Sequence, residues 1–193
     1  MDTHVVLPTT THTHTIVLLH GRDSTTAEFA PEFFESQATD GRTLPETFPG
    51  IKWAFPTASL IRSARFGTEM SQWFDMHSTE DPHEESQHDD DQKHQLSEAA
   101  ASITKIVNEE AQIIGSDHSS FDGAYQGVRT PILLSHAQDD EVINIKYGRE
   151  LRDELTRMGY QVEWREYEDG GHWVNEPRGV DDIVAFVRRH SSL

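Results

Sequence analysis

Short apolar runs alternate with amphipathic segments along this chain, and that alternation limits the folds open to it. Runs suited to strands lie at residues 15–20, 51–55, 131–135 and 161–167, and segments suited to helices lie at 25–36, 96–114, 145–158 and 180–189. Strands that alternate with helices favour a mostly parallel sheet with helices on both faces. We therefore expect an α/β fold and, at 193 residues, a single domain over 1–193.

Three loops that follow these strands carry residues suited to acyl-transfer chemistry. One is the turn at 20–22, a second carries Asp140 and a third carries His172. In parallel sheets, working residues sit at the carboxyl ends of strands. A backbone turn that donates N–H groups, a carboxylate and an imidazole are three of the four parts that nucleophilic acyl transfer needs. The fourth part is the nucleophile.

The acid of this set has two candidates, because Asp139 and Asp140 are adjacent and only one of them can face an imidazole. Both could instead cap the helix that begins near Ile145. His172 lies between glycine and tryptophan, and the preceding glycines permit backbone conformations that place an imidazole. The alternative for His172 is a surface histidine, one of 12 in the chain.

The nucleophile is absent from the sequence in its expected form. No serine stands in a Gly-x-Ser-x-Gly string, which is the elbow that carries this nucleophile in α/β-hydrolases. The string at 123–127 has tyrosine in the middle, and a phenol with a pKa near about 10 is a poor nucleophile at neutral pH. The remaining candidates do not stand between a strand and a helix: Ser24, Ser116, Ser119 and Ser120.

Composition excludes several classes of function. With a formal net charge of −18, the chain is not expected to bind nucleic acid. No apolar run approaches the roughly 20 residues of a membrane-spanning helix, and the N-terminus does not resemble a signal peptide, so we expect a cytoplasmic protein. The acidic, histidine-rich stretch at 77–95 is expected to be a solvated loop. Its histidines do not have the spacing of a zinc site, and we expect neither a metal nor another cofactor.

Together these motifs resemble the acyl-protein thioesterase/carboxylesterase branch of the α/β-hydrolases, including fungal members. The matching strings are Leu19-His20-Gly21, Trp73-Phe74-Asp75, His136-x-x-x-Asp140-x-Val142, Gly171-His172 and the helix at 97–114. The resemblance implies Asp140 as the acid and His172 as the base, with Asp139 as the alternative acid. It also implies an oxyanion loop at Gly21 and Arg22, and Trp73 and Phe74 on the substrate side. The implied substrates are small acyl esters or thioesters, including acylated proteins.

One departure from this family is large. Only 16 residues separate Ile114 from Pro131, too few for the strand, elbow, helix and second strand that belong there. The sequence thus predicts a sheet truncated in its centre by a deletion between about 117 and 130, and an inactive or impaired hydrolase. Two alternatives are an active hydrolase with Ser24 or Ser119 as nucleophile, and a non-catalytic binding protein that uses the 77–94 loop. The sequence carries no signal for an oligomeric state.

Overall fold

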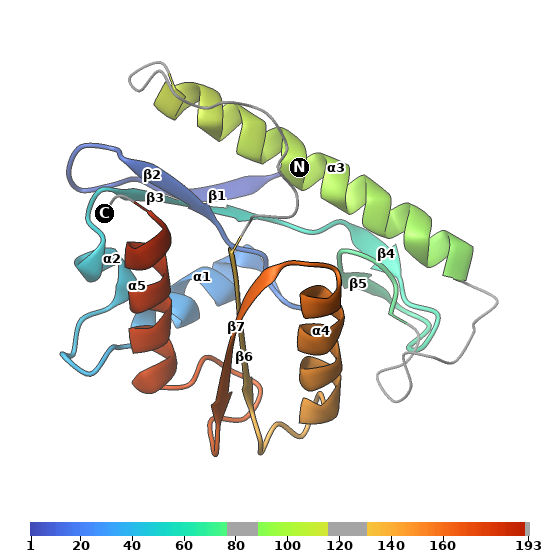
Figure 1. Ribbon diagram of the computed structural model, residues 1–193. Helices are drawn as coiled ribbons and strands as arrows, with labels where there is room; N and C mark the ends of the chain where they lie inside the picture. The colour runs from blue at the N-terminus through green and yellow to red at the C-terminus, as the bar shows by residue number, and fades with distance from the viewer. Residues whose placement is uncertain (77–88, 116–130, 192–193) are drawn as a thin grey trace. The chain divides into compact units, whose positions relative to one another are not determined.

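The computed structural model describes residues 1–76, 89–115 and 131–191. The chain divides into two compact units (Figure 1). The first unit comprises Met1–Phe33 and Phe48–Phe121, and the second comprises Phe34–Thr47 and Asp122–Leu193. Each unit has its own sheet and helices, and each is described by itself. The expectation of a single domain stays a prediction.

The first unit is built on a three-stranded sheet. Its order is β1 (Thr3–Val6), β3 (Ile51–Pro56) and β2 (His14–Val17). β2 pairs with β3 in parallel, whereas β1 pairs with β3 antiparallel. The predicted strands at 15–20 and 51–55 are therefore present, although the first ends at Val17. A second, antiparallel pair joins β4 (Leu60–Arg62) to β5 (Glu69–Ser71).

Helices lie on both faces of this sheet. Because successive residues of a strand face opposite sides, β3 contacts a helix on each face. On one face, Lys52 binds Glu110 of the long helix α3 (Asp89–Gly115). On the other face, Phe55 contacts Phe29 of α1 (Thr26–Glu35), with ring centroids 6.0 Å apart. Figure 1 shows α3 running past the three-stranded sheet and on past the β4–β5 hairpin.

The stretch at 57–95 is more regular than the sequence predicts. It contains the β4–β5 hairpin, and α3 begins at Asp89 rather than near residue 96. The expected acidic loop at 77–95 is therefore wrong for residues 89–95. The physical reason is that Asp90 and Asp91 lie in the first turn of α3, where negative charge is stabilised by the helix dipole. Residues 77–88 lie outside the described part of the chain.

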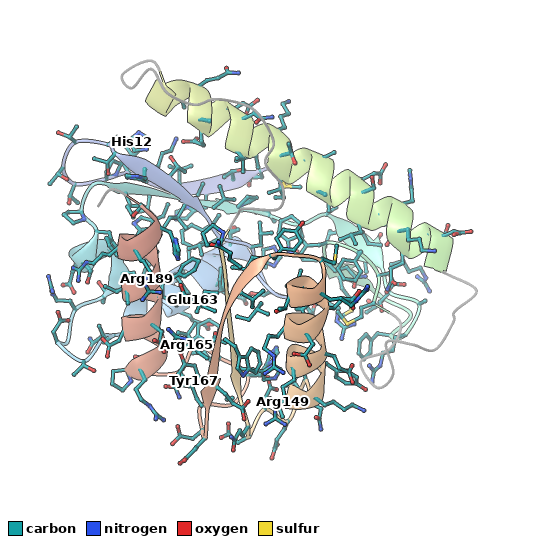
Figure 2. All side chains as sticks on the ribbon, viewed as in Figure 1. His12, Arg149, Glu163, Arg165, Tyr167 and Arg189 are labelled. Carbon is teal, nitrogen blue, oxygen red and sulfur yellow. The ribbon has the colours of Figure 1, made fainter. Side chains whose placement is uncertain are left out.

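The second unit is built on two parallel strands, β6 (Pro131–Ala137) and β7 (Gln161–Tyr167). Its helices are α4 (Ile145–Arg157), α5 (Arg178–His190) and the short α2 (Leu44–Thr47). Trp164 faces α4 at Gly148, whereas Arg165 and Tyr167 bind Asp182 of α5 (Figure 2). The two long helices thus cover opposite faces of the β6–β7 pair, as predicted for an α/β fold.

The central gap predicted from the sequence falls where one unit ends and the other begins along the chain. In the described residues, β2 pairs with β3 in the first unit, and β6 pairs with β7 in the second. The predicted deletion point, between about 117 and 130, lies within the undescribed residues 116–130.

Candidate active site

The loop after β6 holds Asp140 by its own backbone. One carboxylate oxygen, Oδ1, accepts hydrogen bonds from the backbone N–H groups of Val142 and Ile143, both at 2.9 Å. The Asp140 side chain is only 6% exposed. This local turn fixes the carboxylate and leaves its second oxygen, Oδ2, to face outward from the turn.

That second oxygen is paired with His172. The His172 ring nitrogen Nδ1 lies 2.8 Å from Asp140 Oδ2. Because Oδ2 of an ionised carboxylate can only accept, the proton is assigned to Nδ1. The His172 side chain is 55% exposed, and its other ring nitrogen, Nε2, makes no hydrogen bond within the described residues. The pair thus has the geometry of an acid that orients a general base.

The ionisation of Asp140 agrees with this geometry. Burial alone raises the pKa of its carboxyl group, but hydrogen bonds from His172, Ile143 and Val142 outweigh burial. The net result is a pKa below the usual value of 3.8. Asp140 is therefore a carboxylate at neutral pH, which is the form that can accept the Nδ1 proton.

Asp139, the alternative acid, has a different partner. Its Oδ1 accepts a hydrogen bond from the backbone N–H of Gly171 at 2.8 Å. The two adjacent aspartates therefore hold one loop at two points, Asp139 at its backbone and Asp140 at the His172 ring. Gly171 has φ +60°, a conformation that favours glycine. Of the two aspartates, only Asp140 contacts the imidazole.

A second histidine, His136, hydrogen-bonds the loop that carries Asp140. His136 Nε2 donates to the backbone oxygen of Ile143 at 2.9 Å and lies 3.2 Å from Asp140 Oδ2. Its side chain is 12% exposed. The ring fits against α4 only because residue 148 is glycine: a Cβ there would lie 2.5 Å from His136 Nδ1. The sequence motif includes His136, but its supporting role depends on contacts with the next helix and could not be predicted locally.

The predicted oxyanion turn lies in the first unit, after β2. His20 is buried, and its Nε2 accepts from the backbone N–H of Ala58 at 3.0 Å. The Arg22 guanidinium donates to the Met76 oxygen at 3.0 Å. Within the described residues, the backbone N–H groups of Gly21 and Arg22 have no acceptor. The turn therefore has two free backbone donors, which is what an oxyanion site requires.

Trp73 and Phe74 are held beside that turn. The Trp73 indole N–H donates to the His20 oxygen at 2.9 Å, and the two rings lie 5.4 Å apart. Asp75, which follows them, is buried and accepts from the backbone N–H of Ala64 at 2.8 Å. The motif thus joins the oxyanion turn to the β4–β5 hairpin within the first unit.

Comparison with known proteins shows which proteins this chain is similar to. No family model matches the chain. The chain is 23% identical, over 217 aligned positions, to acyl-protein thioesterase 1 of Neurospora crassa, and the alignment covers 90% of this chain and 86% of that protein. A 61-residue stretch is 30% identical to acyl-protein thioesterase 1 of Gibberella zeae, and it covers 32% of this chain but only 26% of that protein's length.

Solved structures give the same answer for the fold. Acyl-protein thioesterase 2 of Zea mays matches with a TM-score of 0.75 at 21% identity, over 97% of this chain and 98% of that one. SOBER1 of Arabidopsis thaliana matches with a TM-score of 0.68 at 17% identity, over 92% and 98%. The chain has the α/β-hydrolase fold and is similar in sequence to acyl-protein thioesterases. The predicted fold and the family resemblance are confirmed.

Set against this α/β-hydrolase fold, the predicted site residues fall into two groups. Asp140 and His172 are in contact in the second unit, whereas the oxyanion turn at 21–22 and the 73–74 pair lie together in the first unit. Among the described residues of the second unit, no serine or threonine hydrogen-bonds the His172 ring. Ser24 is half-buried, and its hydroxyl faces the Thr25 backbone oxygen at 3.5 Å.

The other candidates fall outside the described residues. These are Ser116, Ser119, Ser120 and the string at 123–127, together with most of the 77–94 loop invoked for a non-catalytic role. Across the residues that the structure does describe, no group of three His, Asp or Glu side chains could hold a metal ion. No helix in that part of the chain is long and apolar enough to span a membrane.

Proposed function

We propose that this α/β-hydrolase carries the acid–base pair of a carboxylic-ester or thioester hydrolase and lacks the nucleophile that would complete it. The observation that carries the proposal is the 2.8 Å contact between His172 Nδ1 and the buried Asp140 carboxylate. An aspartate that orients an exposed imidazole in this way is the arrangement of a general base. The names of the Neurospora and maize relatives support acyl thioesters as the substrate class.

In a complete site of this kind, His172 Nε2 takes the proton of the nucleophile as its oxygen attacks the acyl carbon. The same nitrogen then gives that proton to the leaving thiolate or alkoxide, and water hydrolyses the acyl-enzyme in a second cycle. Asp140 holds the ring and stabilises its charged form. We assign the Arg22 N–H to the oxyanion and the 73–74 pair to the substrate side of this site.

As written, the chain has no Gly-x-Ser-x-Gly string. The alignment to the Neurospora protein runs over 217 positions, more than the 193 residues of this chain, so that relative contains segments without a counterpart here. Loss of the elbow removes the serine and one oxyanion donor together. Loss of a catalytic serine costs about 10⁶-fold in turnover in a serine hydrolase, and we infer a similar impairment here.

The natural setting that we propose is the cytoplasm, with a small acyl thioester, an acyl ester or an acylated protein as substrate. A thioester fits this site because a thiolate is a good leaving group that depends little on protonation. His172 can supply the proton that the leaving group does take up. The high negative charge of the chain, −18, opposes substrates that are themselves strongly anionic.

A graft of the missing segment tests the proposal. A strand–elbow–helix segment with a Gly-x-Ser-x-Gly string, of the kind that carries the nucleophile in α/β-hydrolases, would replace residues 117–130, and hydrolysis of acetyl and palmitoyl thioesters would be measured before and after. We expect turnover only in the grafted protein. In that protein His172→Ala should abolish turnover, whereas His94→Ala, at an exposed histidine of α3, should leave turnover unchanged. A grafted protein that folds, as judged by circular dichroism, but does not turn over would contradict the roles given to Asp140 and His172.

A further inference from the structure

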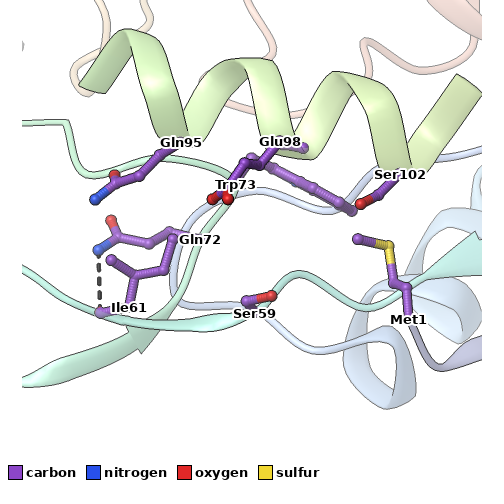
Figure 3. A pocket seen from close by; sticks show the side chains of 9 residues that line it. Met1, Ser59, Ile61, Gln72, Trp73, Gln95, Glu98 and Ser102 are labelled. Carbon is purple, nitrogen blue, oxygen red and sulfur yellow. Dashed lines mark hydrogen bonds between the residues drawn. The ribbon is translucent and has the colours of Figure 1, made fainter. Parts of the chain in front are cut away.

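Among the described residues, one cavity in the first unit is lined by residues of that unit alone. It lies beneath α3, between that helix and the β4–β5 hairpin, and has a volume of about 480 Å³ (Figure 3). Its walls include Ile61, Gln72 and Trp73 from the hairpin side, and Glu98 and Ala99 from α3. A volume of this size is within the range of small-molecule sites.

Gln72 contributes a buried polar atom that has no partner. The residue is 1% exposed, and its Nε2 donates to the Ile61 backbone oxygen at 3.2 Å and approaches Asp75 Oδ1 at 3.5 Å. Because both neighbours are acceptors, they fix which end of the amide is the nitrogen. The other end, Oε1, is buried without a hydrogen-bond donor. Figure 3 shows this oxygen on the α3 side of the amide, away from Ile61.

The uncommitted groups of the cavity favour a ligand that donates hydrogen bonds. Gln72 Oε1 can only accept, and buried acceptors without donors are rare in proteins. Glu98 adds a carboxylate. Its contact with His94, 3.4 Å, joins two side chains that are 68% and 74% exposed, so it competes weakly for a ligand. The Gln95 oxygen is already occupied by the backbone N–H of Asp75 at 2.8 Å.

Part of the remaining wall suits an apolar body, beside the hydroxyl groups of Ser59 and Ser102, and the charge of the chain disfavours an anion. Trp73 presents its indole to the cavity beside Ile61 and Ala99, and aromatic faces attract ammonium groups. The net charge of −18 raises the local concentration of cations and repels carboxylates.

We propose that this cavity binds a small alkylammonium ligand, with its N–H groups directed at Gln72 Oε1 and Glu98 and its alkyl part against Trp73. The site is built from Gln72, Trp73 and Glu98 within one unit. It shares Trp73 with the substrate side assigned above, but binding of the ligand does not require turnover. A ligand of four or five heavy atoms in a half-open cavity is expected to bind in the millimolar range.

Three probes of equal size test the ligand class on the full chain: n-butylammonium, n-butanol and n-butyrate. Binding would be followed by NMR at the indole N–H of Trp73 and by thermal shift. We expect saturable binding of butylammonium, at least fivefold weaker binding of butanol, and none of butyrate. Equal binding of all three probes would overturn the proposal. So would no binding of butylammonium up to about 50 mM, which is the result expected if only water fills the cavity.

Two matched pairs of variants locate the site on α3. Ala99→Phe fills the cavity and should abolish binding, whereas Ala100→Phe, at an exposed position of the same helix, should not. Glu98→Gln should weaken butylammonium binding about two- to fivefold, whereas Glu109→Gln, also exposed and outside the cavity, should leave it unchanged. Binding that survives both Ala99→Phe and Glu98→Gln would place the ligand elsewhere and refute the assignment.

Discussion

Replacement of Asp140 by alanine is expected to destabilise the protein more than the same replacement of Asp139. Asp140 is 6% exposed and accepts three hydrogen bonds at 2.8–2.9 Å, from His172, Val142 and Ile143. Hydrogen bonds to a charged acceptor contribute about 1.5–3 kcal/mol each, and they do not add fully when they share one carboxylate. Val142 is exposed, so its freed N–H group can bind water.

These terms predict a loss of about 2–4 kcal/mol in the free energy of unfolding for Asp140→Ala. Asp139 is exposed and accepts one hydrogen bond, from Gly171, so Asp139→Ala should cost about 0.5–1.5 kcal/mol. Urea unfolding followed by circular dichroism measures both losses. NMR of the imidazole adds a second readout, because only Asp140→Ala removes the acceptor of the hydrogen bond from His172 Nδ1. An equal or larger loss for Asp139→Ala would refute the reasoning.

The contribution of Asp140 to the free energy of unfolding depends on pH. The folded pKa of Asp140 is lowered, so its contribution is present above the unfolded pKa of about 3.9 and is lost as pH falls through the folded pKa. The stability difference between wild type and Asp140→Ala should therefore shrink below about pH 4. A difference that grows on acidification would contradict the assigned charge state.

Three further predictions concern the frame around the site. Glu163 and Glu166 have folded pKa values of about 2, mainly through hydrogen bonds from arginine, so stability should fall between about pH 4.5 and pH 2, as acid titration followed by circular dichroism would show. Gly148→Ala should cost about 1–2 kcal/mol in urea unfolding, because the new Cβ would lie 2.5 Å from a ring nitrogen. Glu110→Gln should cost about 2–3 kcal/mol, because Glu110 and Lys52 are each only 14% exposed.

Each of these has a control in the same chain. Gly21→Ala meets nothing within 4 Å and should be nearly neutral, in contrast to Gly148→Ala. Glu109→Gln breaks an exposed pair with Lys105 and should cost less than about 1 kcal/mol, in contrast to Glu110→Gln. Stability that stays flat between pH 4.5 and pH 2 would contradict the lowered glutamate pKa values.

The sequence predicts those elements whose pattern is local. β7 is found at 161–167 as expected, because its alternation of apolar and charged residues is a strand signal in itself. β1 was not predicted, because Thr3–Val6 is short and is defined by pairing with residues about 50 positions away. The early start of α3 has a signal in the sequence, because three successive aspartates at 89–91 favour a helix N-terminus as well as a loop.

The site shows the same division between local and tertiary information. Asp140 and His172 could be named because each follows a strand, and the topology of a parallel sheet brings such loops together. The choice between Asp139 and Asp140 could not be made from the residues alone, because both fit the loop. It depends on which carboxylate meets the ring and which meets the backbone of Gly171, and that is a tertiary contact.

The central claim, an acid–base pair without a nucleophile, is tested most directly by labelling the intact chain with a fluorophosphonate probe. This probe reacts with serines that a neighbouring base activates, so its target is the nucleophile itself. We predict no labelled serine in the wild-type chain and one labelled serine after the elbow segment is grafted. A single labelled serine in the wild-type chain, lost in His172→Ala, would show that a nucleophile is present and would contradict the account.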